Sequence, residues 1–81
     1  MTATTKNRNL DVLVLFISVN IKRYRTEARL TQEDLAARCR ISFSRISELE
    51  RGATTPTLRT LANVAQALKV PVADLLRAPS A

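Results

Sequence analysis

The sequence predicts one compact all-α domain with five helices. Apolar residues recur at three- and four-residue steps through most of the chain, and a serine or threonine precedes three of these stretches, where it can cap a helix. The chain has 81 residues, of which 46% are hydrophobic. That is enough for one small core and leaves no room for a second domain.

The first helix is predicted from Leu10 to Glu27. Valine, isoleucine and phenylalanine are so dense between residues 12 and 21 that a strand is locally plausible. The three- and four-residue steps nevertheless favour a helix. Its stripe, which we expect to face the domain, consists of Leu10, Leu13, Val14, Ile17, Ile21 and Tyr24.

The second helix is expected to begin at Gln32, behind a capping box. The hydroxyl of Thr31 can accept from a first-turn amide, while Glu33 and Asp34 lie at the positive end of the helix dipole. Its narrow apolar face is made of Leu35, Ala36 and Cys39. We interpret the cysteine as a small buried hydrophobic residue.

The third helix is predicted from Phe43 to Arg51, with Ser42 as its cap and Gly52 as its stop. Ile46 and Leu49 point inward at this spacing. The outer side is then formed by Phe43, Ser44, Arg45, Ser47 and Glu48.

Two further helices complete the domain, which we place at residues 10–77. Thr57 caps a core helix, and Pro71 opens a short one that ends at Leu76. The core helix repeats Leu58, Leu61, Ala62, Ala65 and Leu68 at helical spacing. Residues 1–9 and 78–81 are expected to be a disordered leader and a frayed tail.

Composition narrows the classes of function. The chain has no histidine, one cysteine and one glycine, which argues against histidine catalysis, the usual zinc sets and a glycine-rich phosphate loop. We therefore expect neither an enzyme nor a cofactor, metal or small-molecule ligand. The longest apolar run, Val12 to Ile17, is too short to span a membrane. A single cysteine fits the reducing cytoplasm.

Charge points to a polyanionic partner. Thirteen basic and seven acidic residues give a net charge of +6, and such a balance on a small domain favours phosphate neutralisation. Charge alone does not separate DNA, RNA and a membrane surface, although the few aromatic residues argue against a stacking platform for single strands.

Three motifs in register carry a resemblance to a known family. TQEDLA, then IS, then ISELERG resemble the Cro/C1-type helix-turn-helix family, also called the XRE family, of bacterial and phage DNA-binding regulators. The likeness continues through Pro56-Thr57-Leu58 to Asp74-Leu75-Leu76 and covers roughly residues 17 to 76. It implies a lambda repressor-like fold. The layout is also that of restriction-modification controller proteins and of small phage or plasmid repressors.

The resemblance and the side-chain chemistry together imply a DNA-binding surface. The helix at residues 43–51 would lie in the major groove of duplex DNA, with its first turn at the base edges. Phe43 would pack on a thymine methyl, Ser44 would contact a base edge or phosphate, and Arg45 would bind guanine O6 and N7. Gln32 and Arg51 would contact phosphate.

Several charged residues keep more than one interpretation. Glu48 would accept from a cytosine amino group, or be a solvated residue or a partner for Arg45. Lys6 and Arg8 would form a DNA-contacting arm or fray with the leader. Lys22, Arg23 and Arg29 would be solvated charges or backbone contacts.

The family also implies a structural ion pair between Arg25 and Glu50 of the ERG motif. At Arg40 the chain departs from the family, whose turn usually has glycine there. A bulky residue held at positive φ costs about 1 kcal/mol.

A homodimer is predicted because the first helix is apolar on two sides. At about 100° per residue, a second set falls nearly opposite the first, and a helix apolar on both faces is expected to be buried on both. We predict that this set, Val12, Leu15, Phe16 and Val19, forms the dimer interface. The C-terminal helix, with Val72 and Leu76, is an alternative or additional interface, and a leader folding back is the alternative to a dimer.

A rival function is a protein-interaction module, such as an antitoxin or adaptor, using the same fold.

Overall fold

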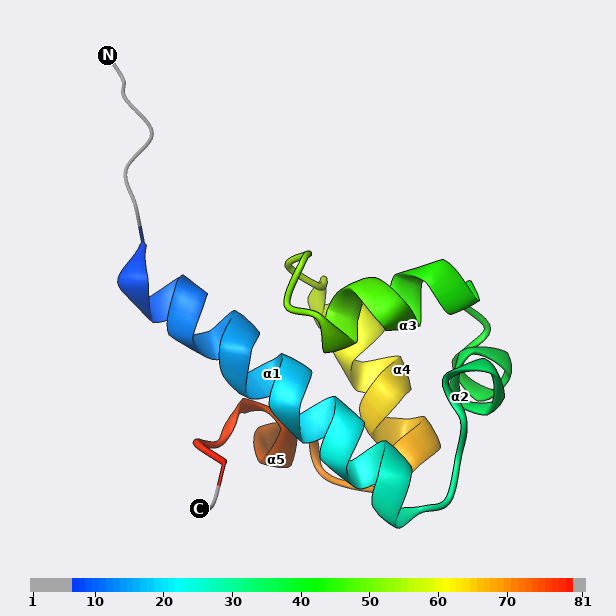
Figure 1. Cartoon of the computed structure of the whole chain (residues 1–81). Helices are drawn as coiled ribbons and strands as arrows, with labels where there is room; N and C mark the ends of the chain where they lie inside the picture. The colour runs from blue at the N-terminus through cyan, green and yellow to red at the C-terminus, as the bar shows by residue number, and fades with distance from the viewer. Residues whose placement is uncertain (1–6, 80–81) are drawn as a thin grey trace.

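The structure is a computed structural model that describes residues 7–79, and in this range it forms five helices and no strand. They are α1 (Arg8–Glu27), α2 (Gln32–Cys39), α3 (Phe43–Glu50), α4 (Leu58–Leu68) and α5 (Val72–Leu76). α1 packs against α3 and α5, while α4 packs against α2 and α5 (Figure 1). The predicted five-helix all-α fold is confirmed.

The capping residues act as the sequence predicts. Thr31 Oγ1 accepts from the Asp34 amide at 3.0 Å, and Asp34 Oδ2 accepts from the Thr31 amide at 2.9 Å, which completes a capping box. Ser42 and Thr57 each accept from the amide three residues ahead, at 3.1 Å. Each of these contacts satisfies an amide that a helix start leaves without a partner.

The start of α1 differs from the prediction. The helix begins at Arg8, two residues before Leu10, because Asn7 Oδ1 accepts from the Leu10 amide at 3.1 Å and caps it. Arg8 and Asn9, expected in the leader, are therefore helical. Residues 1–6 of the leader, Lys6 included, and residues 80–81 of the tail lie outside the described residues.

One core joins all five helices. Ile21, Leu35, Ile46, Val64 and Leu75 are each 0% exposed and come from α1, α2, α3, α4 and α5 in turn. Cys39, 5% exposed, belongs to the same core, as predicted. Burial raises the pKa of its thiol, because a thiolate would lose solvation there. This cysteine is a packing residue.

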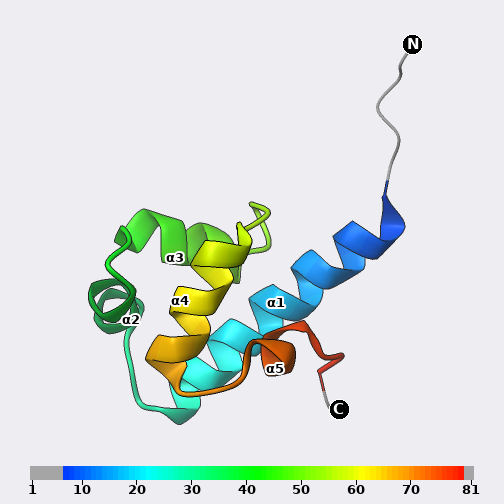
Figure 2. The ribbon, with the colours of Figure 1, turned by 180° about the vertical axis from the view of Figure 1, so that it is seen from behind.

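The inward stripe of α1 is buried only in part. Ile17 and Ile21 lie in the core, but Leu10 and Leu13 are 40% and 37% exposed. The expectation that these two leucines are buried with the rest of the stripe is wrong, because the first turns of α1 project beyond the other helices (Figures 1 and 2). Helical spacing gave their direction, and only the fold shows that nothing in residues 7–79 covers them.

The buried face of α4 also differs from the prediction. Leu61, Ala65 and Leu68 are buried, but Leu58 is 80% exposed and Ala62 is exposed. The two exposed residues are four apart and share a row that the helix turns to solvent. Val64, omitted from the predicted stripe, is fully buried in their place.

A buried asparagine ties the two ends of the domain together. Asn20 in α1 is 3% exposed, and its Nδ2 donates to the carbonyl oxygens of Leu75 at 3.0 Å and Arg77 at 2.8 Å. Both carbonyls lie at the C-terminal end of α5, where a helix leaves acceptors without backbone partners. Apolar periodicity does not predict the burial of Asn20, because its partners Leu75 and Arg77 are more than 50 residues away in the sequence.

Three basic residues adopt the left-handed conformation after helices. Arg29, Arg40 and Lys69 have φ of 61°, 58° and 61°, and Gly52 has φ of 68°. Gly52 therefore ends α3 as predicted, and Arg40 occupies the strained position that the sequence predicts. A cation is favourable near the negative end of a helix dipole, which offsets part of the strain.

An ion pair joins α1 to the end of α3. Arg25 Nε donates to Glu50 Oε2 at 2.6 Å, and Arg25 Nη2 donates to Glu50 Oε1 at 3.0 Å. The two side chains are only 11% and 4% exposed. Arg25 Nη1 also donates to the Leu30 carbonyl at 2.8 Å. The hydrogen bond to Glu50 raises the pKa of Arg25, so the guanidinium is held in its charged form.

We predict that Arg25→Met lowers the free energy of unfolding by about 3–5 kcal/mol, because it leaves the Glu50 carboxylate buried without its partner. Urea denaturation followed by circular dichroism measures this. The matched control is Arg23→Met, which breaks an exposed pair with Glu27 and should cost less than about 1 kcal/mol. An Arg25→Met protein that melts like the parent but binds DNA weakly would make Arg25 a phosphate ligand instead.

We predict that Arg40→Gly raises the melting temperature by a few degrees. The substitution relieves about 1 kcal/mol of backbone strain, and a more flexible unfolded chain cancels part of the gain. Arg38→Gly is the control, because Arg38 is inside α2 and glycine there should destabilise by about 1 kcal/mol. A lower melting temperature for Arg40→Gly would mean that the arginine makes a contact worth more than the strain.

Candidate nucleic-acid interface

The first turn of α3 presents its side chains to solvent. Ser42 holds the start of the helix through its cap, and Phe43, directly after it, is 50% exposed. Ser44 is exposed as well. Ile46 and Leu49 anchor the opposite side of the helix in the core, at 0% and 2% exposure. A rigid helix therefore carries an apolar ring and a hydroxyl on its free surface.

Arg45 lies at the edge of this surface with an unused donor. Its Nε is buried and has no hydrogen-bond partner among residues 7–79. The side chain lines an open hollow of about 350 Å³ together with Ile41, Ser42 and Thr60. A buried guanidinium N–H without an acceptor is costly. Thr60 of α4, which sequence spacing did not associate with this surface, forms one wall of the hollow.

Glu48 and Arg51 lie further along α3. Glu48 is half-buried, and the ion pairs found among residues 7–79 do not include one between Glu48 and Arg45. Arg51 follows the last residue of α3, where its Nη1 donates to Ser47 Oγ at 2.8 Å. Arg51 is exposed, so its charge remains available to solvent on the same helix.

Gln32 is joined to the ion pair between α1 and α3. Its Nε2 donates to Glu50 Oε1 at 3.0 Å, the oxygen that also accepts from Arg25 Nη2. One hydrogen of the Gln32 amide is therefore used inside the protein, and the second remains. From the sequence, Gln32 is expected to contact phosphate. Its contact with Glu50 is not predicted, because residues 32 and 50 meet only through tertiary packing.

The remaining basic residues of the sequence analysis are spread over the surface. Arg8, Lys22, Arg23 and Arg29 are all exposed. Arg23 Nε lies 3.2 Å from Glu27 Oε2, and its guanidinium is 5.7 Å from the Tyr24 ring centroid. Arg23 therefore already has intrachain partners.

The outer face of α1 remains largely uncovered in the single chain. Leu15, Val12 and Val19 are 58%, 44% and 41% exposed. Phe16, the fourth residue expected on this face, is half-buried. The face is thus narrower than the sequence predicts, with three exposed aliphatic side chains at its centre.

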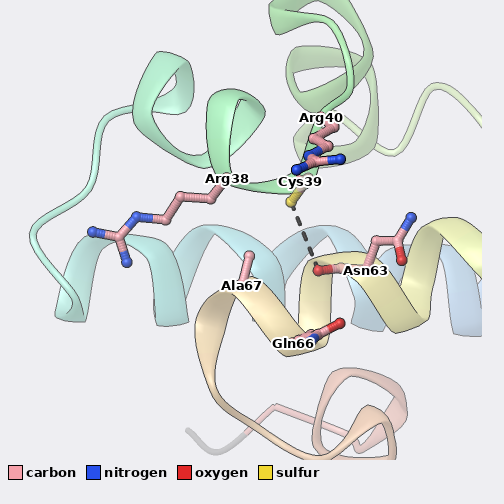
Figure 3. A pocket seen from close by; sticks show the side chains of 6 residues that line it. All are labelled: Arg38, Cys39, Arg40, Asn63, Gln66 and Ala67. Atoms are coloured by element: carbon pink, nitrogen blue, oxygen red, sulfur yellow. Dashed lines mark hydrogen bonds between the residues drawn. The ribbon is translucent and has the colours of Figure 1, made fainter.

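A polar hollow of about 450 Å³ lies between the end of α2 and α4. Cys39 Sγ donates to the Asn63 carbonyl across it at 3.9 Å (Figure 3). Arg38 and Arg40 flank it on the α2 side, and in Figure 3 Arg38 extends away from the cysteine. None of the residues predicted to bind DNA lines this hollow.

Residues 7–79 contain neither a cluster of metal-ligating side chains nor a membrane-spanning helix. No group of three or more histidine, cysteine, aspartate or glutamate residues is arranged to hold a metal ion. No helix in this part of the chain has the length and apolarity to cross a membrane.

Comparison with known proteins gives the family. The helix-turn-helix family model HTH_3 matches residues 21–75. The HTH-type transcriptional regulator y4dJ of Sinorhizobium fredii, itself uncharacterised, is 43% identical over 60 residues, which cover 74% of this chain and 78% of that protein.

Two solved structures share the fold. The hypothetical transcription factor NHTF from Neisseria superposes with a TM-score of 0.82 at 26% identity, covering 98% of this chain and 86% of its own. A mutant of the restriction-modification controller protein C.Esp1396I gives a TM-score of 0.73 at 32% identity, covering 78% and 80%. The family model's match over residues 21–75 and the 43% identical relative together show that this chain belongs to the XRE-type helix-turn-helix family of transcriptional regulators.

Proposed function

We propose that this protein binds specific sites in duplex DNA as a homodimer and thereby regulates transcription, with α3 as the recognition helix in the major groove. The observation that carries the proposal is the exposed first turn of α3. There Phe43 and Ser44 face solvent, and Arg45 holds a donor without an acceptor. In helix-turn-helix proteins the first turn of the second helix is the part that reaches base edges.

The chemistry of these side chains suits direct readout. An arginine can donate two hydrogen bonds to guanine O6 and N7, and an exposed ring can contact a thymine methyl. The Nε–H of Arg45 has no acceptor in the protein, and this buried, unpaired donor is costly. An acceptor on DNA would give it a hydrogen bond and remove that cost. Gln32 and Arg51 lie near the other end of α3, where Gln32 donates to Glu50 and Arg51 follows the last helical residue. We assign Gln32 and Arg51 to phosphate, and Glu48 to a cytosine amino group or to solvent.

The net charge of +6 supports a polyanionic partner. Selection of bound sequences from random duplexes tests the proposal directly. Enrichment of one motif with twofold symmetry is expected. Binding without any enriched motif would reduce the function to non-specific, salt-dependent attachment.

We predict that Arg45→Ala weakens binding to the selected site by about 1–3 kcal/mol and relaxes the preference at one base pair. Arg77→Ala is the control, because it removes the same charge from an exposed side chain beyond α5. Fluorescence anisotropy at fixed salt, on the selected and on random duplexes, measures both. Equal losses on the two duplexes would make Arg45 a phosphate contact.

The outer face of α1 supports the homodimer. Leu15 is 58% exposed, and Val12 and Val19 flank it on the same face at 44% and 41%. We assign these three side chains, with the half-buried Phe16 at their edge, to the interface. Burying exposed apolar area contributes about 25 cal/mol per Å² before the costs of association. Pairing also lets two short recognition helices read two half-sites, which raises affinity beyond that of a single helix.

We predict that Leu15→Glu combined with Val19→Glu gives a folded monomer that binds the selected site weakly, because two carboxylates on each copy would be buried at the interface. Sedimentation velocity at micromolar concentration measures the mass, and circular dichroism checks the fold. Leu58→Glu is the matched control, since Leu58 is 80% exposed on α4. If Leu58→Glu alone gave the monomer, the interface would lie at α4.

The same apolar face favours a second candidate function, a protein-interaction module. It predicts a parent protein that is monomeric alone and becomes part of a complex only with a different chain. A dimer of the parent in sedimentation, with an enriched motif in selection, excludes that candidate.

A further inference from the structure

Charged residues border the exposed apolar face of α1 in an order that matters for pairing. Asp11 lies on the N-terminal side of Leu15, and Lys22 lies on the C-terminal side of Val19. Both side chains are exposed, and neither belongs to an ion pair within residues 7–79. At about 100° per residue they fall on the same edge of the helix, near each other in angle and three turns apart. Thus one edge of the face carries a negative charge at one end and a positive charge at the other.

This order distinguishes the two ways in which a second copy can pack on the face. In a parallel pair about a twofold axis, opposite edges of the two helices meet, so the edge that carries Asp11 and Lys22 does not meet its counterpart. Neither charge then gains a partner of opposite sign from that edge. In an antiparallel pair about a twofold axis, the same edge of each helix meets, and Asp11 lies beside Lys22 of the second copy. The same ion pair then forms twice. Charges that flank an apolar seam set the orientation of paired helices in this manner.

The positions of Asp11 and Lys22 also determine the register of the two α1 helices. A twofold axis at the level of Phe16 and Ile17 is equally far along the helix from Asp11 and from Lys22. The same axis brings Leu15 next to Val19 of the second copy. These side chains are 58% and 41% exposed in the single chain, and in the pair they would cover each other. The charges and the apolar side chains therefore select one and the same register.

We propose that two copies of this protein pair through antiparallel α1 helices, with Asp11 of each copy beside Lys22 of the other. This inference rests on the proposed homodimer and specifies its partner surface, orientation and register. The first turns of α1 project beyond the rest of the chain, so the helix has the free length that an antiparallel overlap needs. Arg23, which is already paired with Glu27 in its own chain, lies on the other edge and is not required for the contact.

Charge reversal tests the pairing. Asp11→Lys and Lys22→Asp should each weaken the homodimer by about tenfold, because each places like charges at two symmetric contacts. The double variant Asp11→Lys with Lys22→Asp should dimerise like the parent. A mixture of the two single variants should form heterodimers, since both contacts are then attractive. Sedimentation equilibrium without DNA measures these constants.

Lys69→Asp is the matched control, because it makes the same change of charge at the exposed residue that caps the C-terminal end of α4, in a conformation that aspartate tolerates. It should leave the dimer unchanged. Single reversals at positions 11 and 22 that also leave the dimer unchanged would overturn the antiparallel register.

Cross-linking gives a second, independent measurement of orientation. In the proposed register Val12 lies beside Arg23 of the second copy, whereas the two Val12 residues are well apart. A disulfide needs Cα atoms within about 7 Å. Val12→Cys mixed with Arg23→Cys should therefore form a mixed disulfide, and neither variant should cross-link to itself. Self-linked products would indicate a parallel pair. Cys39, 5% exposed in the core, does not compete.

The outcomes separate this inference from the proposed function. A parent dimer that passes the DNA selection but fails both α1 tests retains the function and loses the pairing proposed for α1. A dimer that passes both α1 tests but shows no enriched DNA motif retains the pairing and loses sequence-specific binding. A monomeric parent overturns the pairing and the homodimer together.

Discussion

The arrangement of the helix-turn-helix depends on one buried carboxylate. Glu50, 4% exposed at the end of α3, accepts from Arg25 of α1 and from Gln32 at the start of α2. Arg25 in turn donates to the Leu30 carbonyl in the loop before α2. The directions of these hydrogen bonds fix where α2 begins relative to the end of α3, which apolar packing alone would leave less specific. The cost of burying the charges is offset only because every partner is in place.

The same contact links the core to the proposed DNA surface. Gln32 Nε2 donates to Glu50, so the Gln32 side chain is already oriented in the protein without DNA. Ser42 likewise holds the first amides of α3 and thereby places Phe43 and Arg45. Such preorganisation reduces the conformational entropy lost on binding. The Nε of Arg45 is the one buried side-chain nitrogen or oxygen within residues 7–79 that has no hydrogen-bond partner.

The two halves of α1 have different surroundings. Its C-terminal half supplies Ile17, Ile21 and Asn20 to the interior, and Asn20 fixes the end of α5. Its N-terminal half leaves the domain and keeps Leu10, Val12 and Leu13 more than a third exposed. Exposed aliphatic residues on several sides of one helix are costly in water. A partner helix that covers the outer face would remove part of this cost, which connects the stability of the fold to assembly.

The sequence by itself determined the number and type of the helices. Caps such as Thr31, Ser42 and Thr57 act on amides only three residues away. Apolar periodicity is likewise a property of each helix alone. It also predicted the burial of Cys39. Likeness to a family pointed to the positive φ of Arg40 and to the pair of Arg25 with Glu50. Only the tertiary structure decided that Leu10, Leu13 and Leu58 are exposed and that Asn20 is buried. It also decided that Gln32 contacts Glu50 and that Thr60 lines the hollow beside Arg45. Periodicity gives the direction of a side chain, whereas its burial depends on whether a distant part of the chain reaches that side of the helix.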